Sequence, residues 1–146
     1  MRNCNKTGIV VLLIAAACTT RNAALSVHLA DYSAHPISER LRVDMPSGEA
    51  PLYAELRSVL DVQDFRSASL AEDAFGRPLL RLCFAPHGRD KFSALARQNL
   101  QRRLVFLLEG KLLFAPVIQS ASAPDCLEIS GAVTAQHAAA LQRILR

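Results

Sequence analysis

Side chains that could perform metal chemistry are present in this chain, but their spacing does not group them. The four histidines, His28, His35, His87 and His137, are spread over the whole sequence. A zinc site needs ligands that converge on one ion at about 2.0–2.3 Å, and closely spaced His and Cys residues usually announce it. No such pair occurs here, so the sequence predicts no metal site.

Catalytic groups are also not assembled by the sequence. There is no Gly-x-Ser-x-Gly elbow and no Cys-His pattern with a local signature. The carboxylate pairs Glu72-Asp73 and Asp61/Asp64 could support acid–base chemistry, yet solvated turns favour the same residue types. We therefore expect a protein without enzymatic activity or cofactor. The alternative, a hydrolase with an unfamiliar site, would need a pocket that joins Glu72 or Asp73 to a histidine.

The four cysteines differ in the chemistry that their positions allow. Cys4 lies in the N-terminal segment, and Cys18 follows a run of small residues. Cys83 and Cys126 fall in predicted strands, where an oxidising compartment would let them form a disulfide. Two small buried core residues explain this pair equally well.

The N-terminus has the pattern of a secretory signal. Arg2 and Lys6 precede an apolar run over 8–17 that ends in small residues. A transmembrane helix needs about 20 apolar residues, and this run stops well short of that. Residues Ile14 to Cys18 look like a lipobox, the bacterial site at which a cysteine is acylated.

From this pattern we expect residues 1–17 to be a lipoprotein signal peptide and 18–24 a tether. A lipid on Cys18 would hold the exported protein on the periplasmic side of a bacterial membrane, inner or outer, because several acyl chains anchor a protein stably. Cleavage by ordinary signal peptidase, which would leave Cys18 as a free thiol, is the alternative.

The charge of the chain argues against nucleic acid as a partner. Residues 1–17 contain Arg2 and Lys6 and no acidic residue, so the formal net charge falls from +4 to +2 without them. Nucleic-acid-binding domains usually combine a clustered basic face with stacking aromatic side chains. This chain has no Trp and two Tyr, and its Phe residues mostly follow apolar stripes.

Residues 25–146 are predicted to form one domain with a core of its own. The alternation Leu25, Val27, Leu29 predicts a strand. Further strands and two hairpins are predicted over 40–45, 65–71 with 78–84, 105–108 with 111–114, and 126–129. Helices are predicted from Asp90 through an apolar stripe ending at Leu104, and after Thr134 as N-cap.

The order of elements from 61 to 146 resembles the head part of the first periplasmic domain (P1) of SecD, a subunit of the bacterial protein-export machinery. The matching positions are Gly76 and Pro78, Glu109-Gly110, Phe114-Ala115-Pro116, and Ile129 to Thr134. The resemblance implies an α+β fold, a mostly antiparallel sheet with two helices packed on one face. Relatives tend to carry a threonine and a glycine near the end of the first helix, where this chain has Ala96 and Gln101-Arg102.

The resemblance implies noncatalytic binding of a protein or polypeptide in the cell envelope, because the SecD head is thought to hold the translocating chain. The six transmembrane helices of SecD are absent from this sequence, so we expect a holder of polypeptides without a motor of its own. The alternative is a periplasmic inhibitor or immunity lipoprotein that acts against a toxin or hydrolase.

Two groups of residues are candidates for partner binding. The apolar group predicts a peptide groove or a sheet edge open to β-strand addition, although core packing accounts for it as well. The basic group predicts a face for an acidic partner, although a solvated helix face explains it more simply. The apolar group is Leu112, Phe114, Pro116, Val117 and Ile118, and the basic group is Arg97 and Arg102 with Arg89, Lys91 and Arg103 around them.

Overall fold

The computed structural model describes residues 24–33, 40–46, 48–131 and 133–146. The predicted signal peptide, Cys18 and His35 lie outside these residues. The elements in chain order are β1 (Leu25–Asp31), β2 (Arg40–Val43), β3 (Leu52–Glu55), β4 (Leu60–Asp61), the 3₁₀ turn η3 (Val62–Asp64), β5 (Phe65–Glu72), β6 (Pro78–Phe84), α2 (Pro86–Gln98), β7 (Arg103–Leu108), β8 (Lys111–Phe114), β9 (Cys126–Ser130) and α3 (Ala135–Ile144).

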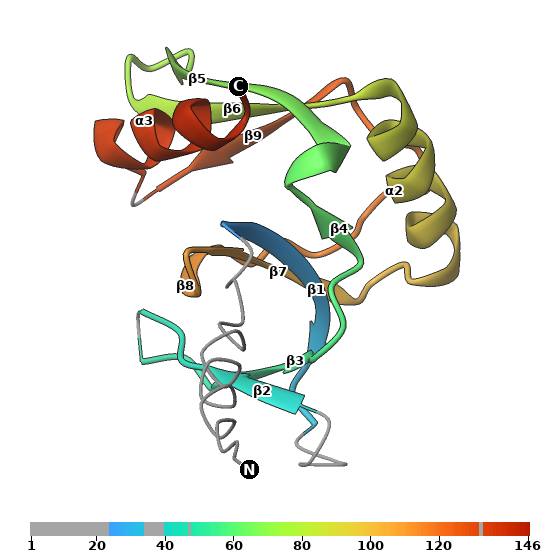
Figure 1. The fold of residues 1–146 in the computed structure, drawn as a ribbon. Coiled ribbons are helices and arrows are strands. Elements are labelled where there is room, and N and C mark those ends of the chain that lie inside the picture. The colour runs from blue at the N-terminus through green and yellow to red at the C-terminus, as the bar shows by residue number, and fades with distance from the viewer. Residues whose placement is uncertain (1–23, 34–39, 47, 132) are drawn as a thin grey trace, which may run out of the picture.

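The strands form two antiparallel sheets, which Figure 1 shows one above the other. The large sheet has the order β2-β3-β1-β7-β8, and β4 pairs with the start of β1. The small sheet has the order β5-β6-β9. The α+β class with antiparallel strands and two helices is confirmed. The expectation of one sheet is corrected, because alternation shows which residues share a face but not which strands pair.

The nearly continuous apolar sequence of β7 is explained by burial on both faces of the large sheet. Leu104, Phe106 and Leu108 point into the main core, which the two sheets and both helices share. Val105 and Leu107 point the other way, into a smaller cluster with residues of β1, β2 and β3. Strands covered on both faces lose the usual alternation of apolar and polar residues.

The helices do not share one face of one sheet. Helix α3 packs on β5 of the small sheet, while α2 lies against β4, η3 and β6, where the chain passes between the sheets (Figure 1). Thr134 caps α3 as predicted, and its hydroxyl accepts the backbone N–H of His137 at 3.3 Å. None of the helices in the described ranges is long and apolar enough to cross a membrane.

Helix α2 begins one turn before Asp90 and ends well before Leu104, so the predicted helix is corrected at both ends. Its N-cap is Ala85, followed by Pro86, whose ring presets the first helical φ angle. Gly88 lets the helix approach the backbone of Asp64, because a Cβ there would lie 1.9 Å from the Asp64 carbonyl oxygen. The helix ends at Gln98, and Gln101 takes a φ of 70° where the chain turns into β7.

Candidate functional site

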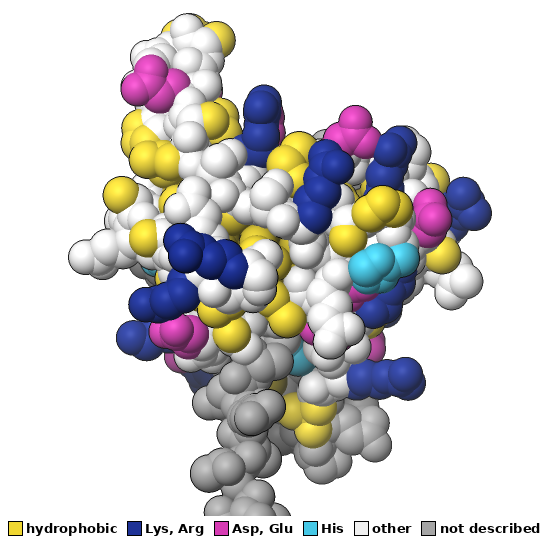
Figure 2. Space-filling model, turned by 45° about the horizontal axis from the view of Figure 1, so that its top comes forward, with side chains coloured by type: hydrophobic (Ala, Val, Ile, Leu, Met, Phe, Trp, Pro, Cys, Tyr) yellow, Lys and Arg dark blue, Asp and Glu magenta, His cyan; other side chains and the backbone are white. Residues whose placement is uncertain are grey.

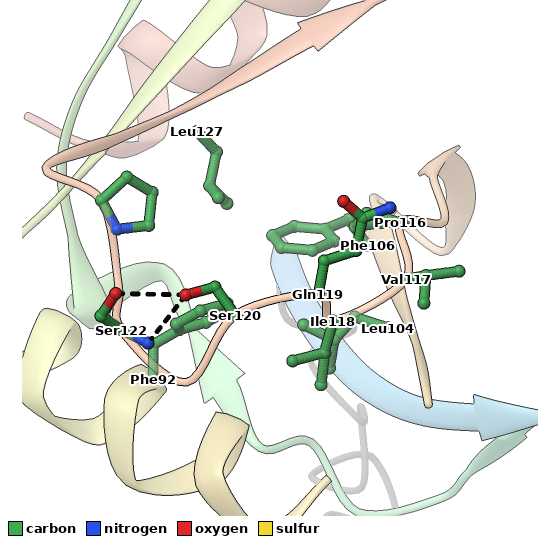
Figure 3. Close-up of a pocket in the computed structure, with 11 residues that line it drawn as sticks. Phe92, Leu104, Phe106, Pro116, Val117, Ile118, Gln119, Ser120, Ser122 and Leu127 are labelled. Atoms are coloured by element: carbon green, nitrogen blue, oxygen red, sulfur yellow. Dashed lines mark hydrogen bonds between the residues drawn. The ribbon is translucent and has the colours of Figure 1, made fainter. Parts of the chain in front are cut away.

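An apolar cavity of about 310 Å³ opens between the two sheets, beside the segment that joins β8 to β9. Figure 3 shows side chains of α2, β7, β9 and this connecting segment converging on it. Among the residues that the structure describes, no charged side chain lines the cavity. The lining residues are Phe92, Leu104, Phe106, Pro116, Val117, Ile118, Gln119, Ser120, Ser122, Pro124 and Leu127.

The wall at 116–118 is held in place by backbone hydrogen bonds to the start of β7. The carbonyl of Pro116 accepts from Leu104 N at 2.9 Å, and Ile118 N donates to the carbonyl of Arg102 at 2.9 Å. The carbonyl of Ile118 accepts from Gln101 N at 2.8 Å. The segment thus continues the pairing of β8 with β7 past Pro116, which has no N–H to give to a ladder.

The floor of the cavity is formed by aromatic side chains that are already fixed by the core. Phe106 is fully buried and stacks on Phe114, with ring centroids 4.1 Å apart. Phe92 of α2 packs against Phe84 with a centroid distance of 5.2 Å. Aromatic pairs of this kind hold their geometry without a ligand. The cavity is therefore preformed, as ligand sites usually are.

The rim of the cavity carries the polar groups. The hydroxyls of Ser120 and Ser122 lie 3.2 Å apart, and both side chains are drawn at the rim in Figure 3. The same loop is tied to α2, because Ala123 N donates to the hydroxyl of Ser93 at 3.2 Å. An apolar floor with hydroxyl and amide groups at the mouth suits a neutral ligand that combines apolar side chains with hydrogen-bonding groups.

Three of the five predicted apolar residues reach the cavity. Pro116, Val117 and Ile118 line it, whereas Phe114 supports it from behind through Phe106. Leu112 packs against the second core cluster on the other side of the large sheet. The sequence did not reveal Phe92, Leu104, Phe106 and Leu127 as lining residues, since they come from three separate elements and each reads as an ordinary core position.

Two residues of the predicted basic face, Arg102 and Lys91, form ion pairs with acidic residues. Arg102 donates to a carboxylate oxygen of Glu55 at 2.8 Å and lies 3.5 Å from a carboxylate oxygen of Asp31. Lys91 pairs with the buried Asp64 at 2.9 Å. Arg97 is exposed in the last turn of α2. In the view of Figure 2, Lys and Arg are interspersed with acidic and apolar side chains, which favours a solvated surface over one basic docking patch.

The charges around Asp31 affect its titration. Burial opposes ionisation, but hydrogen bonds from Arg40 and from the backbone N–H of Ser33 outweigh it. Together with the charges of Arg40 and Arg102 they hold the pKa of Asp31 below its ordinary value. These contacts join β1 and β2 to the loop before β7. Their role is structural, because they lie away from the cavity lining.

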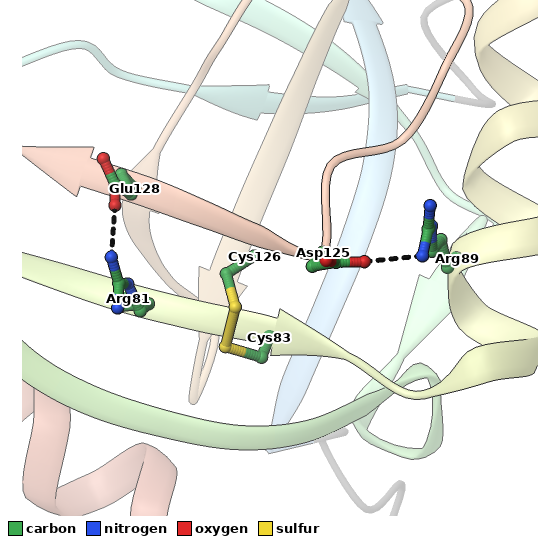
Figure 4. The surroundings of a disulfide bond; sticks show 6 residues. All are labelled: Arg81, Cys83, Arg89, Asp125, Cys126 and Glu128. Carbon is green, nitrogen blue, oxygen red and sulfur yellow. Dashed lines mark hydrogen bonds and ion pairs between the residues drawn. A yellow bond between two sulfur atoms is a disulfide. The ribbon is translucent and has the colours of Figure 1, made fainter.

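Cys83 and Cys126 are joined by a disulfide between β6 and β9, with their sulfur atoms 2.10 Å apart (Figure 4). The two residues are direct neighbours in the register of the small sheet. Arg81 and Glu128, two residues along each strand, form an ion pair of 2.8 Å. β9, which carries Leu127 into the cavity, is therefore linked covalently and ionically to β6.

Two of the titratable groups considered for catalysis, His28 and Asp73, make structural contacts. Both ring nitrogens of the buried His28 are hydrogen bonded, to the carbonyl of Glu55 at 2.8 Å and to the hydroxyl of Ser26 at 2.9 Å. The carboxylate of Asp73 accepts from the backbone N–H of Phe75 and Arg77 in the hairpin turn. Within the described ranges no group of three His, Cys, Asp or Glu side chains is placed to hold a metal ion.

Asp61 and Asp64 stabilise local structure in the same way. Asp61 accepts from Gln63 N at 2.9 Å, and Asp64 accepts from Asp61 N at 2.9 Å, which makes the capping box of η3. Asp64 also fixes α2 through Lys91. The Asp61/Asp64 pair therefore belongs to the turn that connects the two sheets.

Known proteins match this chain over most of its length. The family model described as SecDF, P1 head subdomain, matches residues 38–146. The protein translocase subunit SecDF of Thermus thermophilus is 36% identical over 83 residues, which are 57% of this chain and 11% of that protein. The protein translocase subunit SecD of Aquifex aeolicus is 35% identical over 99 residues, 68% of this chain and 20% of the relative.

Solved structures share the fold. SecDF in its super-membrane-facing form aligns with a TM-score of 0.61 and 27% identity, covering 84% of this chain and 18% of that one. A structure described as a membrane component SecDF that enhances protein export aligns with a TM-score of 0.62. At 24% identity over 84% of this chain and 61% of that chain, it shows the fold alone. None of the matches named here is an inhibitor or immunity protein.

The resemblance seen in the sequence is thereby confirmed, and it extends further toward the N-terminus than the predicted start at Asp61. The chain spans a fifth or less of the length of the two curated relatives. It belongs to the SecDF P1 head subdomain family.

Proposed function

We propose that this protein is a noncatalytic component of the cell envelope that holds unfolded polypeptide during protein export. The observation that carries the proposal is the preformed cavity between the sheets, which is apolar, uncharged and bordered by hydroxyl and amide groups. Folded proteins bury their apolar side chains, whereas an unfolded chain presents them to such a site.

The names of the relatives support the link to export. The curated relatives are protein translocase subunits. We extend to this chain only the link to protein export, and not the activity of a whole translocase subunit, because the chain corresponds to a small part of those proteins. The proposal involves no metal and no cofactor.

We further propose that the protein is exported and anchored through lipid on Cys18 after removal of residues 1–17. The charged start and the apolar run before Cys18 support export. The Cys83–Cys126 disulfide supports it too, because such bonds persist in the periplasm and rarely in the cytosol. Cys18→Ala should release the protein from the membrane fraction into the soluble fraction. Unchanged detergent partitioning of that variant would contradict the anchor.

The binding proposal is tested by titrating the purified protein with a reduced, alkylated protein that stays unfolded, and with its native, disulfide-intact form as control. We expect binding of the unfolded form only. Val117→Asp places a charge in the cavity wall and should weaken this binding about tenfold or more, because a charge cannot be buried there without a partner.

Leu41→Asp is the matched control, since Leu41 is 41% exposed on β2 and does not line the cavity. The control variant should bind as the unchanged protein does. Equal binding by all three proteins, or equal binding of folded and unfolded ligand, would contradict the proposed site.

A further inference from the structure

One edge of the small sheet has unused backbone hydrogen-bonding groups next to the cavity. In an antiparallel sheet, successive residues of an edge strand point their N–H and C=O groups alternately toward the neighbouring strand and away from it. Among the described strands, β9 pairs with β6 on one side and with no strand on the other. Every second residue of β9 therefore directs its backbone groups outward.

The register shows which residues these are. Phe84 N donates to the carbonyl of Asp125 at 3.0 Å, so Asp125 faces β6. The next pair, Cys83 and Cys126, has a Cα–Cα distance of 3.9 Å, which fits the close, non-hydrogen-bonded type of pair. Counting on in steps of two, Cys126, Glu128 and Ser130 point their N–H and C=O groups away from β6.

Within the part of the chain that the structure describes, no hydrogen bond reaches these outward groups. The opposite edge of the same sheet is different. On β5 the outward carbonyl of Ala68 accepts from the side chain of Gln142 on α3, with an N–O distance of 3.0 Å. An uncovered edge of this kind is a template for another extended chain.

The cavity lies directly beside the open edge. Leu127, between the outward residues Cys126 and Glu128, turns its side chain into the cavity, as Figure 3 shows. A strand added next to β9 would run about 4.8 Å beyond it. Its side chains on the core side would then face the cavity walls formed by Phe106, Pro116 and Val117.

We propose that a polypeptide segment binds as a fourth strand of the small sheet, paired with the outer edge of β9, with alternate apolar side chains in the cavity. This inference rests on the proposed function and specifies its geometry. The occupant follows from the site, because outward N–H and C=O groups are matched by an extended backbone and the uncharged lining by neutral apolar side chains. Strand addition at the sheet edge near Pro116 stays a separate prediction, since β8, which leads to Pro116, is also an edge strand.

The test uses a short synthetic peptide in which Leu and Thr alternate, and two N-methylated versions of it. Methylating all Leu amides blocks one edge of the extended peptide, and methylating all Thr amides blocks the other edge. The two versions have the same composition and the same number of methyl groups. Affinities for the purified protein are measured by calorimetry.

We expect one methylated peptide to bind nearly as the parent does and the other about tenfold more weakly or worse, because only one edge pairs with β9. Which version fails reports the direction of the added strand. Equal affinity of all three peptides would overturn strand addition and leave polypeptide binding intact. Equal weakening of both methylated peptides would also overturn it. No binding of the parent peptide would overturn both proposals. Both would also be overturned if a detergent monomer displaced the peptide and bound with the same affinity, because the cavity would then bind any apolar molecule.

A protein variant locates the edge. Glu128→Pro removes an outward N–H that β6 does not use, and Glu128→Ala keeps it while losing the same ion pair with Arg81. We expect about tenfold weaker peptide binding for the proline variant and unchanged binding for the alanine variant. In the unchanged protein, amide exchange of Glu128 should slow when the peptide binds, which is a readout that needs no variant. Unchanged exchange at Glu128 in the peptide complex would overturn the assignment to β9.

Discussion

Gln142 of α3 donates its side-chain amide to the backbone carbonyl of Ala68 on β5, at 3.0 Å. The contact fixes α3 on the small sheet and covers the outward side of β5 at that position. Gln142→Ala should lower the free energy of unfolding by about 1 kcal/mol, as for loss of one hydrogen bond. Gln136→Ala, at an exposed site of the same helix, should leave it unchanged in urea denaturation. Equal stability of the two variants would show that the contact contributes nothing.

Gly88 is predicted to tolerate no side chain. In a helix interior Gly→Ala normally stabilises by about 1 kcal/mol. Here the new Cβ would overlap the Asp64 carbonyl oxygen, so Gly88→Ala should destabilise by about 1–3 kcal/mol through overpacking. Ala94→Gly, at an exposed position of α2, measures the difference in helix propensity between Ala and Gly without a packing effect. Stabilisation of Gly88→Ala in the same denaturant series would refute the close approach of α2 to η3.

The Cys83–Cys126 bond closes a long loop, with a sequence separation of 43 residues. Constraining such a loop in the unfolded chain contributes about 2–4 kcal/mol. Reductant should therefore lower the midpoint of denaturant unfolding by a corresponding amount. A Cys83→Ala, Cys126→Ala double variant should unfold at this lower denaturant midpoint, whether or not reductant is present. Labelling of both thiols by an alkylating agent without prior reduction would contradict the bond.

The stability contributed by Asp31 should depend on pH. Because its pKa is lower in the folded protein than in the unfolded chain, its contribution is present above about pH 4 and is lost as pH falls through the folded pKa. Asp31→Asn should cost about 0.5–1 kcal/mol at pH 7, a value reduced for partial exposure, and less at about pH 3, below the ordinary pKa of an aspartate. Asp44→Asn is the control, since Asp44 is 76% exposed in its ion pair with Arg42. An unfolding cost for Asp31→Asn that is the same at both pH values would exclude this account.

The sequence predicted local structure where one residue type determines it. Thr134 specified the start of α3, and Glu109-Gly110 specified the β7–β8 hairpin, where both residues take positive φ values. Asp90 does not cap the helix, because Pro86 presets the first helical φ angle and Gly88 packs on Asp64 through a tertiary contact. Leu104 lies in β7 and not in the predicted helix, because an apolar residue at that spacing fits a strand as well as a helix.

The candidate site was predictable only in part, because local sequence patterns do not encode tertiary contacts. Pro116, Val117 and Ile118 are adjacent in the chain, and the apolar run broken by Pro116 predicts a binding surface there. Phe92 and Leu127 reach the cavity through the packing of α2 and β9, which spacing does not encode. The open edge of β9 depends on the order of strands in the small sheet, and no local pattern specifies that order.

The most direct test of polypeptide holding is site-specific photo-crosslinking in cells that export protein. A photoreactive residue replaces Val117 in the cavity wall, and Leu41 on β2 serves as the control position. We predict adducts of many masses at 117, formed with newly exported chains and lost when export is blocked, and few at 41. A single discrete adduct at 117, or the same adducts at both positions, would contradict the claim that the cavity holds unfolded polypeptide.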